Sequence, residues 1–239
     1  MGLDLYAGTL TRYYTGQWET IIEQLRGAED KPVFVMRPPG SLIDDKPAEV
    51  QRRILEWRAK LERDLGAVGA LADPFDWPET MDQPYFTDKP DWNCFGAMIL
   101  LAACTEAGVS PPDVMPTSWA AHRALQQMES RTGSAADALY PHLFFVEMWF
   151  PVSRMAVLDT GSPLIKPMRI ASLPWLVSHL QDLNRRTFQI PINQIVADPI
   201  DVPTPEVRDF RAYARAGLVI TLQIALKARE HRLPLVLDA

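Results

Sequence analysis

The chain has 239 residues, of which 47% are hydrophobic and 23% are charged, a composition typical of a folded globular protein and too apolar for intrinsic disorder. Its 24 basic and 30 acidic residues give a formal net charge of −6. This charge argues against nucleic acid or an anionic membrane surface as the main partner, because both ligands attract basic proteins. A basic protein partner is compatible with it.

The N-terminal residues carry neither the charged region nor the apolar region of a secretory signal. The longest apolar stretch, Ala216–Leu226, has eleven residues, whereas a membrane-spanning helix needs about 20. Cys94 and Cys104 stand ten positions apart in a predicted helix, which separates them by roughly 15 Å, too far for a disulfide. These features predict a cytoplasmic protein with reduced thiols and no membrane partner.

Strands and helices alternate in the first part of the chain. Leu3 and Leu5 alternate with Asp4 and Tyr6, which is the period of a half-buried strand. In chain order the patterns predict a strand at Leu3–Ala7, a polar connection at Gly8–Gly16, a helix around Trp18–Leu25, a strand at Pro32–Met36 and a helix from Pro47 to Gly66.

Helices dominate the second part of the chain. Phe95–Ala107 is almost wholly apolar, which predicts a core helix that Gly108 ends. Further along the chain, the patterns predict a helix over Thr117–Arg131, extended runs at Leu143–Val152 and Met155–Leu158, a helix capped by Ser172, an extended Thr187–Ile195, a long helix from Thr204 to His231 and a final strand.

The intermixed elements predict an α/β or α+β fold, with short strands, several helices and a long C-terminal helix that is followed by a short strand. No repeat, low-complexity tract or long linker divides the chain. We therefore expect a single globular domain over residues 1–239. The patterns leave the order of the strands open.

The most unusual composition belongs to Asp73–Asn93, here called the acidic segment. Its four prolines exclude a continuous helix. It contains six acidic residues and one basic residue, so it carries −5 of the net charge of −6. Its aromatic side chains either cover the core from a surface loop or anchor a partner protein, while its carboxylates steer a basic partner. The partner interpretation predicts the binding residues Asp76, Trp77, Glu79, Asp82, Tyr85, Phe86, Asp88 and Trp92.

Cofactor and metal motifs are missing from the sequence. It has neither GxGxxG nor GxxxxGK[ST], and it lacks the GxSxG motif of serine hydrolases. His122, His142, His179 and His231 show neither HExxH nor the paired spacing of a metal site. We therefore expect packing or surface histidines, no metal and no cofactor.

Two residues are candidates for catalysis. Glu147 lies in the apolar run LFFVEMWFPV, where it would share a strand face with Phe145 and Trp149. A carboxyl group in such surroundings acts either as a general acid or base, or as the structural partner of a group such as an arginine. Arg12, in TRYYT after the first strand, places a guanidinium beside two phenols. This group either binds an anionic ligand or anchors the N-terminal loop.

Two stretches carry a resemblance to known proteins, MGLDLYAGTLTRYYTGQWET at the N-terminus and DKPDWNCFGAMILLAAC at 88–104. In these stretches the chain resembles uncharacterised bacterial cytoplasmic proteins of the toxin-immunity type. The resemblance implies a non-enzymatic inhibitor that binds one toxin. It supplies no catalytic residues.

Three hypotheses follow for the function. The first is a cytoplasmic, immunity-like inhibitor that neutralises a bacterial toxin, a basic protein, by binding it through the acidic segment. The second is a small hydrolase or transferase acting on a polar or anionic small molecule, with Glu147 as acid or base and Arg12, Tyr13 or Asp4 as orienting groups. The third is an oligomeric interaction protein.

Overall fold

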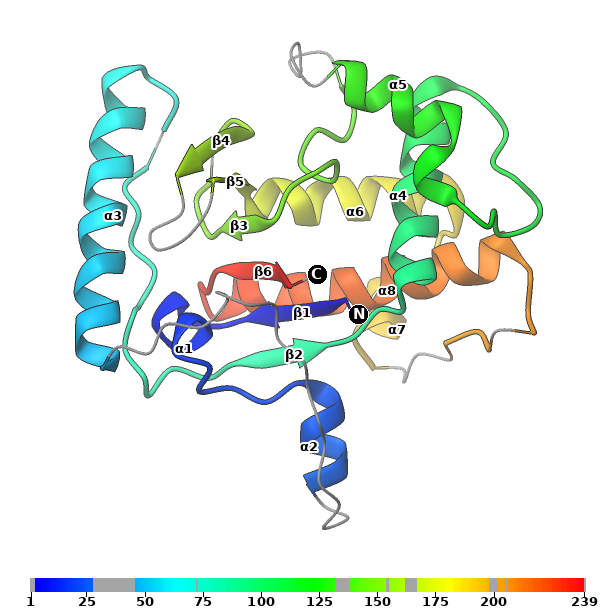
Figure 1. The fold of residues 1–239 in the computed structure, drawn as a ribbon. Helices are drawn as coiled ribbons and strands as arrows, with labels where there is room; N and C mark the ends of the chain where they lie inside the picture. The colour runs from blue at the N-terminus through cyan, green and yellow to red at the C-terminus, as the bar shows by residue number, and fades with distance from the viewer. Residues whose placement is uncertain are drawn as a thin grey trace.

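A mixed β-sheet lies at the centre of the computed structural model, which describes residues 3–27, 46–71, 73–131, 138–153, 155–161, 167–197, 202–204 and 206–238 (Figure 1). Within these residues six strands pair in the order β2-β1-β6-β3-β5-β4. They are β1 (Asp4–Ala7), β2 (Phe86–Asp88), β3 (Met148–Phe150), β4 (Leu158–Gly161), β5 (Pro167–Ser172) and β6 (Leu235–Asp238). β3 runs parallel to β5, and the other pairs are antiparallel. The expectation of a mixed α/β fold is confirmed.

Helices cover both faces of the sheet. α4, α6 and α8 pack on one face, and α1 and α3 pack on the other with part of the acidic segment (Figure 1). The helices are α1 (Leu10–Tyr14), α2 (Ile21–Gly27), α3 (Pro47–Ala67), α4 (Trp92–Ala107), α5 (Arg123–Arg131), α6 (Leu173–Thr187), α7 (Ile192–Ala197) and α8 (Phe210–Glu230), and the short 3-10 helix η1 spans Trp119–Ala121.

The alternation of side chains along each strand produces two cores. Leu5 of β1 and Leu235 of β6 point into the core that α4, α6 and α8 build. Their neighbours Tyr6 and Val236 point into the core under α1 and α3. Because side chains alternate between the two faces of a sheet, both faces of these short strands are buried.

α4 is the most enclosed helix of the structure, with every residue from Cys94 to Cys104 buried. It crosses α8 so closely that a Cβ atom added at Gly217 would lie 2.0 Å from the carbonyl oxygen of Cys94. Both thiols on α4 are free and buried, as the spacing predicts. Among the described helices, none is long and apolar enough to cross a membrane.

Most predicted helices and the terminal strands are confirmed. Asp91, Ser172 and Asp209 each cap a helix with the side chain, accepting a hydrogen bond from a backbone N–H two or three residues further on. The predicted strand at Pro32–Met36 lies outside the described residues.

Five expectations are wrong in detail. The helix predicted over Thr117–Arg131 forms two pieces, η1 and α5, because His122 between them has an extended backbone. The connection after β1 contains α1, because Thr9 caps this short helix by accepting a hydrogen bond from the N–H of Arg12. The run at Leu143–Val152 forms only the three-residue β3, and β5 was not predicted. The segment around Pro191 begins α7 rather than an edge strand, since its carbonyl accepts the N–H groups of Gln194 and Ile195. The long C-terminal helix begins at Phe210, later than predicted.

The close approach of α4 and α8 leads to a stability prediction. Gly217→Ala is expected to lower the free energy of unfolding by about 1–3 kcal/mol, because the new methyl group would displace backbone rather than a flexible side chain. Urea unfolding measures the change. The matched control is Gly66→Ala in α3, where nothing lies within 4 Å of the added Cβ. This change is expected to be neutral or to stabilise by up to about 1 kcal/mol, from helix propensity. Equal effects of the two substitutions would contradict the packing described for α8.

Candidate functional site

Trp77 of the acidic segment lies in the core. Its side chain is only 2% exposed, and its ring stacks on Phe150 of β3 with a centroid distance of 4.6 Å. The guanidinium of Arg58 on α3 lies over the ring and donates a hydrogen bond to the Trp77 carbonyl. Trp77 therefore fixes the acidic segment between α3 and the sheet. The expectation that it offers an exposed anchor to a partner is corrected.

Glu79 has a structural role of the same kind. The carboxylate is 4% exposed and accepts four hydrogen bonds, from the backbone N–H groups of Leu10 and Thr11, the Thr11 hydroxyl and the Trp77 indole. It therefore binds the first N–H groups of α1 in the way that a capping side chain does. Burial raises the pKa of this carboxyl group, and the four hydrogen bonds oppose the rise. Glu79 is not available to a partner.

Arg12 and Tyr85 hold the next turn of the acidic segment. The Arg12 guanidinium donates hydrogen bonds to the carbonyls of Met81 and Gln83 and lies 4.9 Å from the centre of the Tyr85 ring. The half-buried Tyr85 ring in turn stacks on Tyr6 of β1. These contacts favour the anchoring role for Arg12, whose two terminal nitrogens donate to backbone carbonyls while its Nε is buried without a hydrogen-bond partner.

The remaining acids of this part of the segment are exposed. Asp82 lies at the turn that Arg12 holds, and the Thr80 hydroxyl lowers the pKa of its carboxyl group. Asp76 forms an ion pair with Arg232, which follows α8. The charge that Asp76 offers to a partner is therefore partly compensated within the chain.

Phe86 and Asp88 belong to β2, the strand at the edge of the sheet, and both side chains are half-buried. The Phe86 ring lies between His231 and the Lys227 ammonium group. Burial raises the pKa of Asp88, and Lys227 opposes the rise. These two residues mainly attach the edge strand to the end of α8.

Among the aromatic residues predicted as anchors, Trp92 is the most exposed. It is the first residue of α4 and is 50% exposed. Its ring contacts Trp119 of η1 with a centroid distance of 5.5 Å. Gly96 lies one helical turn after Trp92, on the same side of α4, and a Cβ there would lie 2.1 Å from the Trp119 ring. Because Gly96 has no side chain, the Trp119 ring packs directly on the backbone of α4, beside the Trp92 ring.

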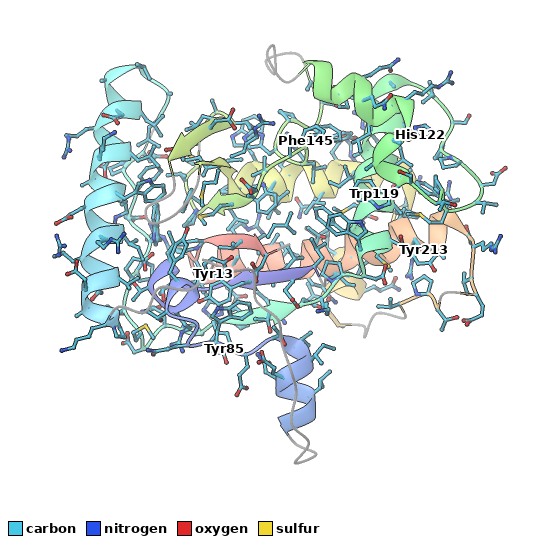
Figure 2. The ribbon with its side chains drawn as sticks, in the orientation of Figure 1. Tyr13, Tyr85, Trp119, His122, Phe145 and Tyr213 are labelled. Carbon is cyan, nitrogen blue, oxygen red and sulfur yellow. The ribbon has the colours of Figure 1, made fainter. Side chains whose placement is uncertain are left out.

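Two exposed acidic residues lie near Tyr213, at the same end of the molecule as Trp119 (Figure 2). Asp91 precedes Trp92 and is exposed, as is Glu206 in the segment before α8. Both carboxylates lie close enough to Tyr213 to add to the rise that burial causes in its pKa. Figure 2 shows Trp119 and Tyr213 at the same end of the molecule, away from Tyr13 and Tyr85. We call Asp91, Trp92, Trp119 and Glu206 the tryptophan surface.

Hydrogen bonds between two chain segments support the tryptophan surface. The N–H of Met115 donates to the carbonyl of Arg208, and the N–H of Phe210 donates to the carbonyl of Asp113. These bonds attach the segment that leads to Trp119 to the segment that carries Glu206. Exposed Val114 and Val207 extend the apolar area along these segments, and the exposed base Arg208 adds one positive charge.

Glu147 does not lie on a strand face with Phe145 and Trp149, since β3 begins only at Met148 and Phe145 has a positive φ of 59°. Its half-buried carboxylate accepts a hydrogen bond from the N–H of Arg169, while its own N–H donates to the Arg169 carbonyl. The side chain thus continues the pairing of β3 with β5. The Arg169 guanidinium pairs with Asp159. These contacts favour the structural interpretation of Glu147.

Two histidines that look isolated in the sequence meet in the structure. The rings of His142 and His179 lie 5.1 Å apart, and both side chains are 7% exposed. No spacing rule finds this pair, because one histidine precedes β3 and the other lies on α6. Elsewhere in the described residues, no three His, Cys, Asp or Glu side chains form a group suited to a metal ion.

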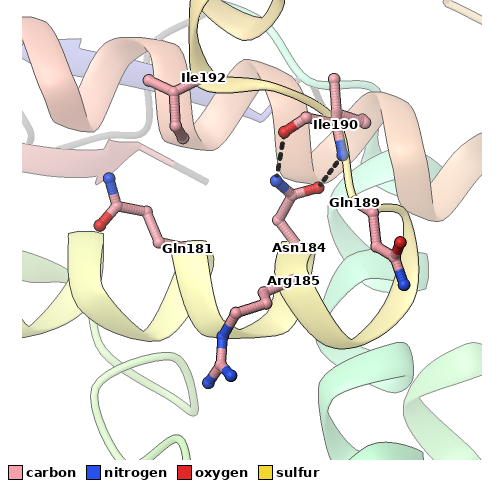
Figure 3. A pocket seen from close by; sticks show the side chains of 6 residues that line it. All are labelled: Gln181, Asn184, Arg185, Gln189, Ile190 and Ile192. Carbon is pink, nitrogen blue, oxygen red and sulfur yellow. Dashed lines mark hydrogen bonds between the residues drawn. The ribbon is translucent and has the colours of Figure 1, made fainter.

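An open pocket of about 610 Å³ lies where α6 turns into α7 (Figure 3). The Asn184 carboxamide in its wall donates to the carbonyl of Ile190 and accepts the N–H of the same residue. One N–H and the oxygen of this amide are therefore used in forming the turn. The pocket contains neither Glu147 nor Arg12; it is lined by Gln181, Asn184, Arg185, Gln189, Ile190 and Ile192.

Comparisons with protein-family models, with curated proteins and with solved structures found no match to this chain. The geometry of the described residues is therefore the basis for the functional proposal below.

The buried carboxylate leads to the second prediction. Glu79→Gln is expected to lower the free energy of unfolding by about 1–3 kcal/mol. A glutamine side chain has only one oxygen to accept the four hydrogen bonds, and its NH₂ group would face two of the four donors. Urea unfolding at neutral pH measures the loss. Asp82→Asn, in the exposed turn of the same segment, is the control and is expected to leave the midpoint unchanged. An unchanged midpoint for Glu79→Gln would contradict the capping role.

Proposed function

We propose that the protein is a cytoplasmic, immunity-like inhibitor that binds a basic partner protein, a bacterial toxin, through the tryptophan surface. The observation that carries this proposal is the exposed Trp92 ring beside Trp119, with the exposed Asp91 next to Trp92 and the exposed Glu206 near Tyr213 of α8. Aromatic side chains at the centre of an interface contribute most of the binding energy, and charges at its rim guide association. Of the binding residues predicted from the sequence, Trp92 is the one on which the proposed contact centres, at the C-terminal end of the acidic segment.

Two features of the surface favour binding without large rearrangement. Trp119 rests on the helix backbone at Gly96, and the segments that carry Trp119 and Glu206 are attached by backbone hydrogen bonds. Rings that are already ordered lose little conformational entropy when a partner covers them. The net charge of −6 adds a long-range attraction for a basic partner, which salt weakens.

The test begins with affinity capture from lysate of the source cell, using the wild-type chain and Trp92→Ala as parallel baits. The wild type is expected to retain a basic protein whose affinity for Trp92→Ala is roughly tenfold lower or weaker. Leu55→Ala is the matched control, because Leu55 is an exposed apolar residue on α3, at the opposite side of the molecule (Figure 1). Calorimetry with the purified partner measures the affinities.

The electrostatic contribution is tested separately by Asp91→Asn. Asparagine caps a helix about as well as aspartate, so this change removes the charge and keeps the start of α4. We expect slower association at low salt and a difference from the wild type that shrinks at high salt. Asp64→Asn on α3 removes an exposed charge far from the surface and is expected to have no such effect on association.

Inhibition is tested by expressing the captured protein in bacteria. Growth arrest that the wild-type chain relieves, and that Trp92→Ala relieves less well, is the expected result. Equal binding of the wild type and Trp92→Ala would overturn the proposed surface. A captured protein that is acidic, or that does not impair growth, would overturn the toxin assignment.

A further inference from the structure

His142 and His179 form the centre of a buried aromatic cluster. The His142 ring stacks on Trp175 of α6 at a centroid distance of 5.7 Å and an interplanar angle of 13°. His179, also on α6, meets the rings of Tyr140, His142 and Trp175 edge to face. The cluster therefore holds the segment before β3, residues 138–147, against α6.

Hydrogen bonding determines which form of the His142 ring fits. Nε2 of His142 lies 3.1 Å from the carbonyl oxygen of Met155, so this nitrogen carries the proton. Nδ1 of His142 is buried without a hydrogen-bond partner, and so is Nδ1 of His179. A second proton on either ring would create a buried cation whose Nδ1–H has no acceptor. The arrangement thus fits two neutral imidazoles.

The charged neighbours do not compensate for such a cation. Asp182 lies one turn beyond His179 on α6, but its carboxylate already accepts hydrogen bonds from the Tyr140 hydroxyl and from Arg185 and Arg186. Glu106 of α4 adds to the rise that burial causes in the pKa of Tyr140. Met155 offers the cluster only its carbonyl.

We propose that the His142–His179 pair is an acid-sensitive lock, which holds residues 138–147 on α6 while both rings are neutral and releases them when either ring is protonated. This proposal is independent of the proposed function. Release would free the carbonyl of His142 from the Trp149 indole N–H, a bond that attaches the segment to β3. The segment would then open locally, while Glu147 at its end stays bonded to Arg169 and Leu237 and the sheet stays paired.

The protonation equilibria give the direction of the effect. Burial lowers the pKa of His142, and burial together with His142 lowers the pKa of His179 to about 4, while Asp182 opposes the shift. Both start from an ordinary value of 6.5. Between these values the opened segment binds more protons than the closed one, so the closed form is fully favoured above pH 6.5 and is lost as the pH falls toward 4.

Hydrogen exchange tests the lock at pH 6.5 and 4.5, with rates corrected for the intrinsic pH dependence of exchange. In the wild type, protection of residues 138–147 is expected to fall by about tenfold or more between the two values, while β1 and β6 stay protected. His179→Phe keeps an aromatic ring in the cluster and removes one titrating group. The loss of protection between the two pH values should therefore be clearly smaller in this variant. His231→Gln, at an exposed histidine, is the control and should behave as the wild type.

Two results would overturn the lock. One is wild-type protection of this segment that does not change with pH, and the other is an equal fall in His179→Phe. If His179→Phe does not fold, NMR titration of the wild-type imidazole signals decides the question. A His179 signal that titrates near pH 4 and a His142 signal that titrates below its ordinary value support the lock, whereas titration of both near 6.5 would exclude it.

Discussion

The close crossing of α4 and α8 at Gly217 is the constraint on which the rest of the structure depends. α4 is buried along most of its length, and it reaches this depth only because no side chain separates it from α8. α8 also leads directly into β6, which pairs with β1 and β3 at the centre of the sheet. The crossing therefore places the first turn of α4, with Trp92, at the surface where the segment before α8 arrives.

The acidic segment divides into a structural part and an accessible end. Trp77 and Glu79 are buried and join α1, α3 and the sheet, while Asp91 and Trp92 begin α4 at the surface. The charged and aromatic residues of the acidic segment therefore serve two different purposes. Buried carboxylates satisfy backbone donors, and exposed carboxylates are left to interact with other molecules.

The sequence predicted the elements whose signals are local. The apolar face of α3, the wholly apolar α4 and the cap at Ser172 depend on residues a few positions apart, and the structure confirms them. The short strands were harder, because β5 is defined by its pairing with β3 and β4 rather than by a pattern of its own.

The candidate sites depend on contacts between distant residues, which a single sequence does not show. The periodicity of the sequence cannot show that Glu79 bonds to the start of α1, 68 residues away, or that the rings of His142 and His179 are in contact. Trp92 was predicted as an anchor from composition, but its neighbour Trp119 was not, because only the fold brings η1 to Gly96. Composition therefore singled out the acidic segment without showing which of its side chains are buried and which are exposed.

The central claim is that a partner covers the tryptophan surface and leaves the buried part of the acidic segment unchanged. Hydrogen exchange of the complex with the captured partner, compared with the free chain, tests it most directly. New protection is expected in peptides that cover residues 88–96 and 113–121, with little change at residues 73–82. New protection at residues 73–82 with none around Trp92 and Trp119 would contradict it.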